Sequence, residues 1–417
     1  MKVLVISYYW PPAGGSGVQR WLKFVKYFQD FGVESLVYCP ENPSYPISDT
    51  SLIEEVPENL KVYRREILEL GKKNKNTVQA GFISENPNWK ERLALFIRAN
   101  VFIPDARMFW IKPSINYLEK VIKKEAIDVV ISTGPPHSMH LIAQGLKERT
   151  GVKWLADFRD PWTDIDYFHH LPFMSWARKK HFSLEKKALK TADLVTVVSE
   201  QMRQNYLKFN PNTHLVYNGY DGDLATTSSL DTSFSMAHIG LLNGDRNPKS
   251  LWKALLELCQ ETPGFKEDLI LKFVGKVAPE VMESLEIYGL NSNCEYIDYV
   301  PNSEVARFQE SSQVLLLLLN DVPASKGIVT GKVFEYFRAQ RPILAVGPQE
   351  GDLDLLLRET GAGELYDFSD VKGLKLEILK LYKAYKQQNL KVESSKITKF
   401  HRKELTRQMA TLLKSLK

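Results

Sequence analysis

A strand, a glycine-rich loop and a helix follow one another in the first 28 residues. The apolar run KVLVIS (residues 2–7) is typical of a strand that is buried on both faces. The stretch SYYWPPAGGSGVQR (7–20) brings two prolines and three glycines, and apolar residues at 18, 21, 22, 25 and 28 then follow helical spacing. With the next apolar run, ESLVYC (34–39), this predicts a strand–helix–strand unit, a parallel sheet and a right-handed crossover.

The same alternation recurs along the rest of the chain. Strand-like runs lie at 128–133, 153–158 and 194–199, and a second series lies at 237–242, 269–275, 294–300, 314–320 and 342–347. Residues 210–233, between the two series, have the Asn, Gly, Asp, Ser and Thr content of a linker. We therefore expect an α/β protein of two doubly wound, Rossmann-like domains, residues 1–230 and 231–395. A basic amphipathic helix over 396–417 follows them, with an apolar stripe of Phe400, Leu405, Met409 and Leu412.

Composition excludes several classes of protein. The chain of 417 residues is 44% hydrophobic and 25% charged, as a globular protein is, and its net charge of +5 is too small to indicate a nucleic-acid binder. The three cysteines, at 39, 259 and 294, are too scattered for a disulfide framework or a zinc cluster, which favours a reducing compartment. No run of about 20 apolar residues could span a membrane, and the first apolar run is too short for a signal peptide. We expect a cytoplasmic protein.

The glycine-rich loop predicts an anion site. It lies at the carboxyl end of the first strand, where open α/β sheets bind ligands. Gly14, Gly15 and Gly17 carry no Cβ, so backbone N–H groups can approach a ligand, and the N-terminus of the next helix favours negative charge. The spacing matches neither the dinucleotide nor the P-loop motif, so a phosphate site and a loop without a ligand both stay open.

A second candidate anion site follows the run 314–320. Thr330 has the side chain of an N-cap for a helix from about Gly331 to Ala339. Lys332 then lies in the first turn, where the helix dipole disfavours a cation unless an anion neutralises it. Glu335 projects from the same face, and its carboxylate could accept both hydroxyls of a ribose. A nucleotide sugar offers the phosphate and the ribose; a Lys–Glu pair on a surface helix is the alternative.

Motifs along nearly the whole chain resemble those of one enzyme family. They are PPAGGSG (11–17), STGPPHSMHLIA (132–143), LADFRDPW (155–162), ADLVTVVSE (192–200), VYNGYD (216–221), HIGLLNGDRNPKSL (238–251), GKVFEYFRAQRPILA (331–345) and FHRKELTRQMATLL (400–413). In this order they resemble the retaining glycosyltransferases of the GT-B fold, of the large family four that builds bacterial surface polysaccharides. The resemblance implies two domains that face each other across a cleft, with the C-terminal helix packed back on the first domain.

The resemblance implies which residues bind the donor. Glu335 is similar to the second glutamate of the family's E-x7-E signature, which binds the ribose, and the segment YVP (299–301) is similar to the loop whose backbone meets the base. Positions under or around the donor diphosphate would be Gly14, Gly15, Thr330, Gly331 and Lys332, and the backbone contact with the base would come from Val300.

Two positions depart from the family pattern. The first glutamate of E-x7-E is Gly327 here, so the usual contact with the sugar hydroxyls is missing. The arginine expected after the glycine of the second domain's first strand is Leu241, and Arg246, with Lys249 behind it, is the expected replacement cation. These departures leave the identity of the donor open.

The first half of the chain would then hold the acceptor. Asp160 and Arg159 follow a strand, where the carboxylate could orient a hydroxyl and the guanidinium could bind phosphate; a mutual ion pair that fixes the loop is the alternative. His137 lies where relatives carry a histidine near the reacting sugar, or it caps the helix that follows. His137 and His140 lack a third ligand, and Asp-x-Asp triplets at 164–166, 221–223 and 352–354 are scattered, so no metal site is expected.

The sequence therefore predicts a metal-independent, retaining glycosyltransferase without a cofactor, with a nucleotide-diphosphate sugar as co-substrate and a glycan or lipid-linked acceptor. A nucleotide-sugar 2-epimerase of the same fold and an inactive nucleotide-sugar-binding protein are the alternatives.

Residues 88–124 and 173–190 mix Trp, Phe and Leu with Lys and Arg. Such segments are typical either of peripheral contact with the inner face of an anionic membrane or of a solvated helix face.

Overall fold

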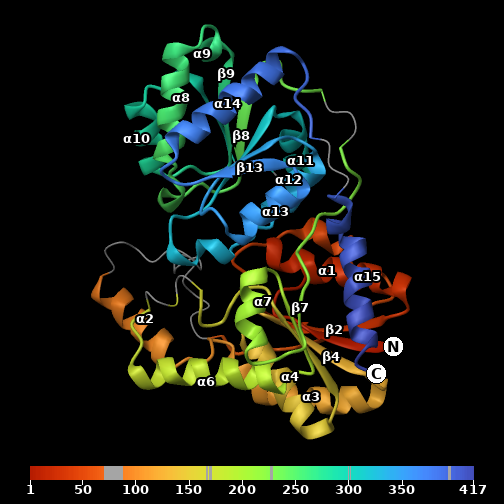
Figure 1. Ribbon diagram of the computed structural model, residues 1–417. Helices are drawn as coiled ribbons and strands as arrows, with labels where there is room; N and C mark the ends of the chain where they lie inside the picture. Colours follow the sequence, from red (N-terminus) through yellow and green to blue (C-terminus); the bar gives the residue numbers. More distant parts are fainter. Residues whose placement is uncertain are drawn as a thin grey trace. The chain divides into compact units, whose positions relative to one another are not determined.

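The computed structural model describes residues 1–69, 88–165, 168, 171–225, 229–298, 300, 302–392 and 396–417. The chain divides into two compact units: unit 1 comprises Met1–Asn218 and Arg402–Lys417, and unit 2 comprises Gly219–His401. Each unit is built on one parallel sheet with helices beside it (Figure 1). The first division lies after residue 218, and the N–H of Tyr220 donates to the carbonyl of Phe400 inside unit 2.

Unit 1 contains a seven-stranded sheet within the described ranges, in the order β3-β2-β1-β4-β5-β6-β7. Its strands are β1 (Lys2–Ile6), β2 (Glu34–Pro40), β3 (Lys61–Arg65), β4 (Val129–Gly134), β5 (Lys153–Phe158), β6 (Leu194–Val197) and β7 (Thr213–Leu215). Its helices are α1 (Ser16–Phe28), α2 (Trp89–Asn100), α3 (Met108–Glu125), α4 (Ser138–Thr150), α6 (Ser175–Thr191), α7 (Glu200–Leu207) and α15 (Arg402–Lys414), with short 3-10 turns η1 (Gln29–Phe31) and η2 (Thr50–Ile53).

Both faces of this sheet are covered. Along β1, Leu4 and Ile6 join the core on the side of α3 and α4, whereas Val3 and Val5 join the core on the side of α1 and α15. This explains why the strand is a continuous apolar run, since a strand covered on both faces has no polar side.

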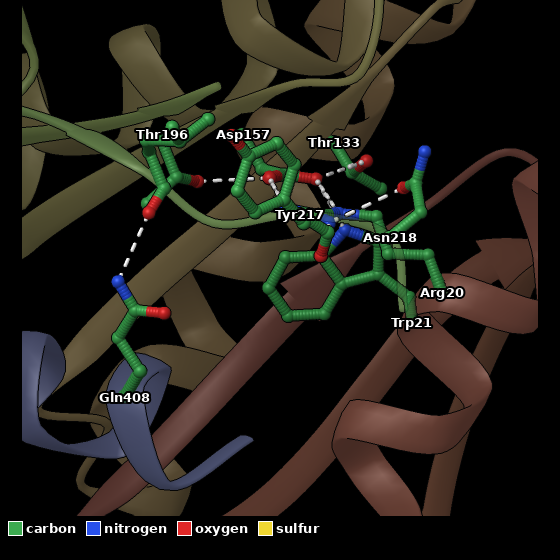
Figure 2. Close-up of polar contacts among 9 residues, drawn as sticks. Arg20, Trp21, Thr133, Asp157, Thr196, Tyr217, Asn218 and Gln408 are labelled. Carbon is green, nitrogen blue, oxygen red and sulfur yellow. Dashed lines mark hydrogen bonds and ion pairs between the residues drawn. The ribbon is translucent and has the colours of Figure 1, made fainter. Parts of the chain in front are cut away.

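The C-terminal helix α15 lies beside α1 in Figure 1 and packs against it. The amide of Gln408 also donates to the carbonyl of Leu215 at 2.9 Å (Figure 2). The expected apolar stripe is corrected at its first residue. Phe400 precedes the helix and packs against Phe334 within unit 2, with the ring planes tilted by 47°. Leu413 is the fully buried leucine of the last turn, and Leu412 is partly buried against the same core.

Unit 2 contains a six-stranded parallel sheet in its described residues, in the order β10-β9-β8-β11-β12-β13. Its strands are β8 (Phe234–Ile239), β9 (Leu269–Val274), β10 (Cys294–Ile297), β11 (Val314–Leu318), β12 (Ile343–Val346) and β13 (Gly363–Tyr366). Its helices are α8 (Lys249–Glu261), α9 (Phe265–Asp268), α10 (Pro279–Ile287), α11 (Asn302–Ser311), α12 (Lys332–Ala339), α13 (Asp352–Thr360) and α14 (Val371–Lys386), with 3-10 turns η3 (Gly244–Arg246), η4 (Asn291–Asn293), η5 (Pro323–Gly327) and η6 (Thr398–Phe400).

The described helices include none that is both long and apolar enough to cross a bilayer. The prediction of an α/β protein with two doubly wound sheets is confirmed.

Candidate functional site

Each sheet has one point at which the strand order reverses, between β1 and β4 in unit 1 and between β8 and β11 in unit 2. Open α/β sheets bind ligands outside the carboxyl ends of their strands at such points. The candidate residues of the two units are therefore described separately, starting from these strand ends.

In unit 2, two glycines with positive φ make room for Lys332. Gly240 follows β8 with φ 107°, and a Cβ there would lie 2.8 Å from the Nζ of Lys332. Gly275 follows β9 with φ 113°, and a Cβ there would lie 3.1 Å from the backbone of Gly240. These two positions favour glycine, and they allow the lysine to lie directly over the end of β8.

Lys332 and Arg246 are partly buried cations. The Nζ of Lys332 lies 3.5 Å from the Nε2 of His238, and burial together with the nearby lysine holds the pKa of His238 well below its usual value, so that ring is neutral. Burial lowers the pKa of Lys332 to about 8; the charge of Arg246 lowers it as well, and Glu335 acts in the opposite direction. Arg246 donates from Nε to the Oδ1 of Asn320, which follows β11, at 2.6 Å. Throughout the described part of the chain, neither cation has a carboxylate oxygen within 4.0 Å.

Lys332 lies at the N-terminus of α12. The N-cap is Gly331, with no side-chain capping bond, rather than Thr330 as the sequence predicts. Thr330 instead accepts a long hydrogen bond from the N–H of Lys332, at 3.4 Å. A Cβ at Gly331 would meet nothing within 4 Å, so this helix end is open, and the positive end of the helix dipole there favours an anion.

The other candidates in unit 2 lie on separate segments of the chain. Glu335, one turn into α12, is half-buried, and its Oε2 accepts from the Nε2 of Gln309 at 3.1 Å. Lys249 begins α8 and its side chain is exposed. Val300 is half-buried, while residues 299 and 301 lie outside the described residues. Sequence reasoning missed Asn320, although its place directly after an apolar strand could have drawn attention to it.

We expect anion binding at this site to weaken with rising pH. Lys332 binds an anion in its protonated form, and its pKa of about 8 means that the free protein loses that proton above pH 8. The affinity for inorganic pyrophosphate should therefore fall by up to about tenfold per pH unit above pH 8. Calorimetry at pH 7, 8 and 9 measures this, and Lys332→Arg should give a flatter profile. Identical pH profiles for the two proteins would exclude Lys332 from the anion site.

In unit 1, the glycines of the first loop have different surroundings. Gly14 donates its N–H to the carbonyl of Ile47 at 2.9 Å, and a Cβ on Gly14 would lie 2.8 Å from that isoleucine. Gly15 is the N-cap of α1 with φ 94°, and a Cβ there would meet nothing within 4 Å. A Cβ on Gly17 would collide with the guanidinium of Arg159. Gly15 is thus the open position, and Gly14 and Gly17 allow close packing.

His137, Arg159 and Asp160 follow the ends of β4 and β5. The ring of His137 stacks on Trp162 with centroids 4.6 Å apart and planes 2° apart, and it makes no capping bond to α4. Burial holds its pKa well below the usual value, so the ring is neutral, and neither ring nitrogen has a hydrogen-bond partner among the described residues. Arg159 donates to the carbonyl of Pro135, and Asp160 is exposed. A neutral imidazole with two unused nitrogens can donate to or accept from a hydroxyl.

A buried carboxylate, which sequence reasoning missed, fixes this edge of unit 1 (Figure 2). Asp157 is fully buried and accepts from Arg20 at 2.8 and 3.2 Å, from the indole of Trp21 at 2.7 Å, and from the hydroxyls of Thr133 and Thr196 at 3.0 and 2.8 Å. Burial alone would raise the pKa of Asp157, but the charge and hydrogen bonds of Arg20 outweigh it, so the pKa lies below the usual value. The carboxylate therefore holds the first turns of α1 against three neighbouring strands.

Arg20 also binds the end of Met1–Asn218, the first of the two chain segments that form unit 1. Its Nη1 donates to the carbonyl of Tyr217 at 2.8 Å and to the Oδ1 of Asn218 at 3.3 Å. Arg402, at the start of α15, donates to the carbonyl of Asn218 and to the side chain of Gln19. Helix α1, which follows the glycine-rich loop, is therefore bonded to both places where the chain leaves and re-enters unit 1.

No group of three or more His, Cys, Asp or Glu side chains that could hold a metal ion occurs among the residues for which the structure gives positions. Of the three Asp-x-Asp triplets, that at 164–166 ends on a residue outside the described part of the chain.

Comparisons with known proteins identify the fold and the family. The model of Glycosyltransferase Family 4 matches residues 16–224, and no curated protein sequence matches at a significant level. Similar solved structures are HepE of Anabaena in complex with UDP (15% identity, all of both chains, TM-score 0.65) and the sucrose-phosphate synthase of Thermosynechococcus elongatus (14% identity, 100% of this chain and 98% of that one, TM-score 0.62). A third is a protein of Listeria monocytogenes proposed to be a UDP-N-acetylglucosamine 2-epimerase (13% identity, 99% of this chain and 96% of that one, TM-score 0.57).

The structural matches extend over the whole chain and have the GT-B fold, which confirms the predicted fold. The family model covers half of the chain, from the start of α1 to the beginning of unit 2. The chain therefore belongs to Glycosyltransferase Family 4 and is a glycosyltransferase of the GT-B fold.

Proposed function

We propose that the protein is a retaining glycosyltransferase that moves a sugar from a nucleoside-diphosphate sugar to a glycan or lipid-linked acceptor during synthesis of a bacterial surface polysaccharide. The observation that carries the proposal is a pair of partly buried cations, Lys332 and Arg246, in unit 2. Neither has an ion-paired carboxylate among the described residues, and Lys332 lies in the first turn of α12. HepE has been solved with UDP and with UDP-glucose, so a UDP sugar is the first donor to test.

The residues of unit 2 would hold the leaving group. When the bond between the sugar and the diphosphate breaks, negative charge develops on the diphosphate. Lys332, Arg246 and the positive end of the α12 dipole would stabilise that charge, because preformed charges and dipoles act strongly in a partly buried site. The acceptor hydroxyl forms the new bond to the sugar, and its proton goes to a diphosphate oxygen. The neutral ring of His137 in unit 1 would hydrogen-bond a sugar hydroxyl.

Glu335 would bind the ribose of the donor. We expect Glu335→Ala to weaken the binding of UDP by about 10- to 100-fold, because hydrogen bonds to a charged group contribute about 1.5–3 kcal/mol. The same substitution should leave the affinity for 2′,3′-dideoxy-UDP unchanged, since that ligand has no hydroxyl to donate. Calorimetry with both ligands measures the difference. An equal loss for the two would mean that Glu335 acts through the fold of α12 instead.

We propose that the reaction needs no metal ion and no cofactor, because fixed cations and a helix N-terminus would face the bound diphosphate. EDTA should then leave the transfer rate within about twofold of its value without chelator. The assay uses purified protein, donor and acceptor, with and without added Mg²⁺ or Mn²⁺. A rate abolished by EDTA and restored by either ion would show that the cations of unit 2 are insufficient.

An isomerase is the second candidate, because the similar structure from Listeria is proposed to be a 2-epimerase. Products distinguish the two functions. A transferase releases nucleoside diphosphate and a new glycoside only when acceptor is present, whereas an epimerase inverts C2 of the sugar without acceptor.

Gly327, in place of the expected glutamate, is the one hint of an inactive binding protein. Slow hydrolysis of the donor by the purified protein would argue against inactivity.

We place the enzyme in the cytoplasm, at the inner face of the membrane. Its cysteines Cys39, Cys259 and Cys294 are all free, which suits a reducing compartment. Lipid-linked acceptors would present their sugars at that surface. Fractionation of cells that produce the tagged protein tests the placement, with release from membranes by high salt as the expected result.

A further inference from the structure

Helix α2 exposes an apolar face. We define the α2 stripe as Trp89, Leu93, Phe96, Ile97 and Val101. Its members recur at helical intervals on one side of the helix and its C-cap, and their side chains are between 39% and 58% exposed, except Trp89 at 70%. Such a stripe is ordinarily the buried face of a helix, yet only the last turn of α2 is buried.

The start of α6 extends this surface. The side chain of Asn100, at the end of α2, donates to the carbonyl of Pro172 at 2.9 Å and accepts from the N–H of Met174 at 2.6 Å. The two helices meet at this corner (Figure 1). Met174 and Trp176 are about half exposed there, so apolar surface continues from the α2 stripe onto the first turn of α6.

Cations border this surface. At about 100° per residue, Arg92 and Arg98 fall on opposite flanks of the α2 stripe, and Lys90 falls within it, between Ile97 and Val101. The ammonium of Lys90 lies 5.6 Å from the ring centroid of Trp89. On α6, Lys179 and Lys180 are exposed beside the apolar turn. The two helices contain nine lysines and arginines, three in α2 and six in α6, against the carboxylates Glu91 and a buried Glu185.

We propose that the α2 stripe and the start of α6 dock on an anionic lipid bilayer. Tryptophan and phenylalanine are favoured at the boundary between headgroups and acyl chains, and flanking cations are attracted to anionic headgroups. A second copy of the chain fits less well, because it would place these cations against one another. The inference extends the proposed function by giving a lipid-linked acceptor a place to meet unit 1. Its test uses no substrate, so it can fail independently of that function.

The test is co-sedimentation of the full chain with vesicles of phosphatidylglycerol and phosphatidylcholine, compared with vesicles of phosphatidylcholine alone. We expect binding to the anionic vesicles, weakened by salt. Leu93→Ser with Phe96→Ser should lower the partition coefficient by about tenfold or more. Lys179→Glu with Lys180→Glu should lower it by about fivefold per charge. The matched control is Ile287→Ser on α10, an isoleucine that is 73% exposed, and it should bind as the unchanged protein does.

Several results would overturn the proposal. One is protein that stays in the supernatant with anionic vesicles, and another is unchanged binding by the Leu93→Ser, Phe96→Ser variant. A dimer in solution that this variant abolishes, without vesicle binding by either protein, would show that a second copy covers the stripe. All the substituted side chains are exposed, so melting temperatures should not change; if the double variant fails to fold, Trp89→Ser replaces it.

Discussion

Replacing Lys332 by methionine should lower kcat/KM by about 10²- to 10³-fold, which is the usual effect of removing one fixed donor at a developing negative charge. It should also make the protein more stable. The methionine keeps most of the apolar stem of the lysine but removes a partly buried charge that has no ion-paired carboxylate among the described residues. Activity and stability therefore change in opposite directions.

The stability effect depends on pH in a defined way. Burial lowers the pKa of Lys332 from 10.5 to about 8, so the folded protein holds this proton less tightly than the unfolded chain does. The charge costs about 1–3 kcal/mol of folding free energy below pH 8, and the cost fades as the pH rises from 8 to 10.5. The gain in melting temperature for Lys332→Met should be largest near pH 7 and small near pH 10. Lys332→Arg is the control, and it should retain part of the activity without the gain. A lower melting temperature for Lys332→Met at pH 7 would contradict this account.

Asp157→Ala should destabilise unit 1 by about 3–5 kcal/mol, because it leaves the buried guanidinium of Arg20 without its counter-charge. For a unit of this size the melting transition should fall by roughly 10–15 °C. Scanning calorimetry measures the shift. Nucleotide affinity should change little, since the charged candidate donor residues Arg246, Lys332 and Glu335 lie in unit 2.

The double substitution Arg20→Met, Asp157→Leu is the matched control for this prediction. It replaces the ion pair with apolar side chains of similar volume, a change that is often neutral or stabilising. We expect the double variant to melt well above Asp157→Ala. If the double variant and Asp157→Ala melt at the same temperature, the hydrogen bonds of Trp21, Thr133 and Thr196 to the carboxylate contribute more to stability than its ion pair with Arg20.

The central strands and the edge strand β10 could be predicted from the sequence, whereas the edge strands β3, β7 and β13 could not. Strands such as β1 and β11 are covered on both faces, so every residue of β11 and every residue of β1 after Lys2 is apolar, and both runs are easily recognised. The edge strand β3 reads KVYRR and is mostly exposed, and the edge strand β7 has three residues inside a segment whose composition indicates a linker. Their positions depend on pairing with a neighbouring strand, which no local pattern records.

The candidate site shows the same limit. Lys332 could be singled out because the helix dipole disfavours a cation in the first turn of a helix. Its role in binding the donor stays a prediction. Arg20 gives no such signal, because a charged residue on an amphipathic helix is ordinarily expected on the solvent-exposed face. Its partner Asp157 lies 137 residues away, and a short polar residue in an apolar strand does not reveal which side chains reach it. Contacts of this kind arise only when the sheet is assembled.

The division of unit 1 into two segments has a consequence for how the chain matures on the ribosome. Residues 219–401 are synthesised between the sheet of unit 1 and α15, and at about 5–20 residues per second they take roughly 10–40 s. During that interval the face of α1 that packs against Leu405 and Met409 has no cover. Unit 2 can finish folding first, although it begins later. The nascent unit 1 must avoid aggregation with an apolar surface open, and the order of synthesis makes its closure the last step of folding.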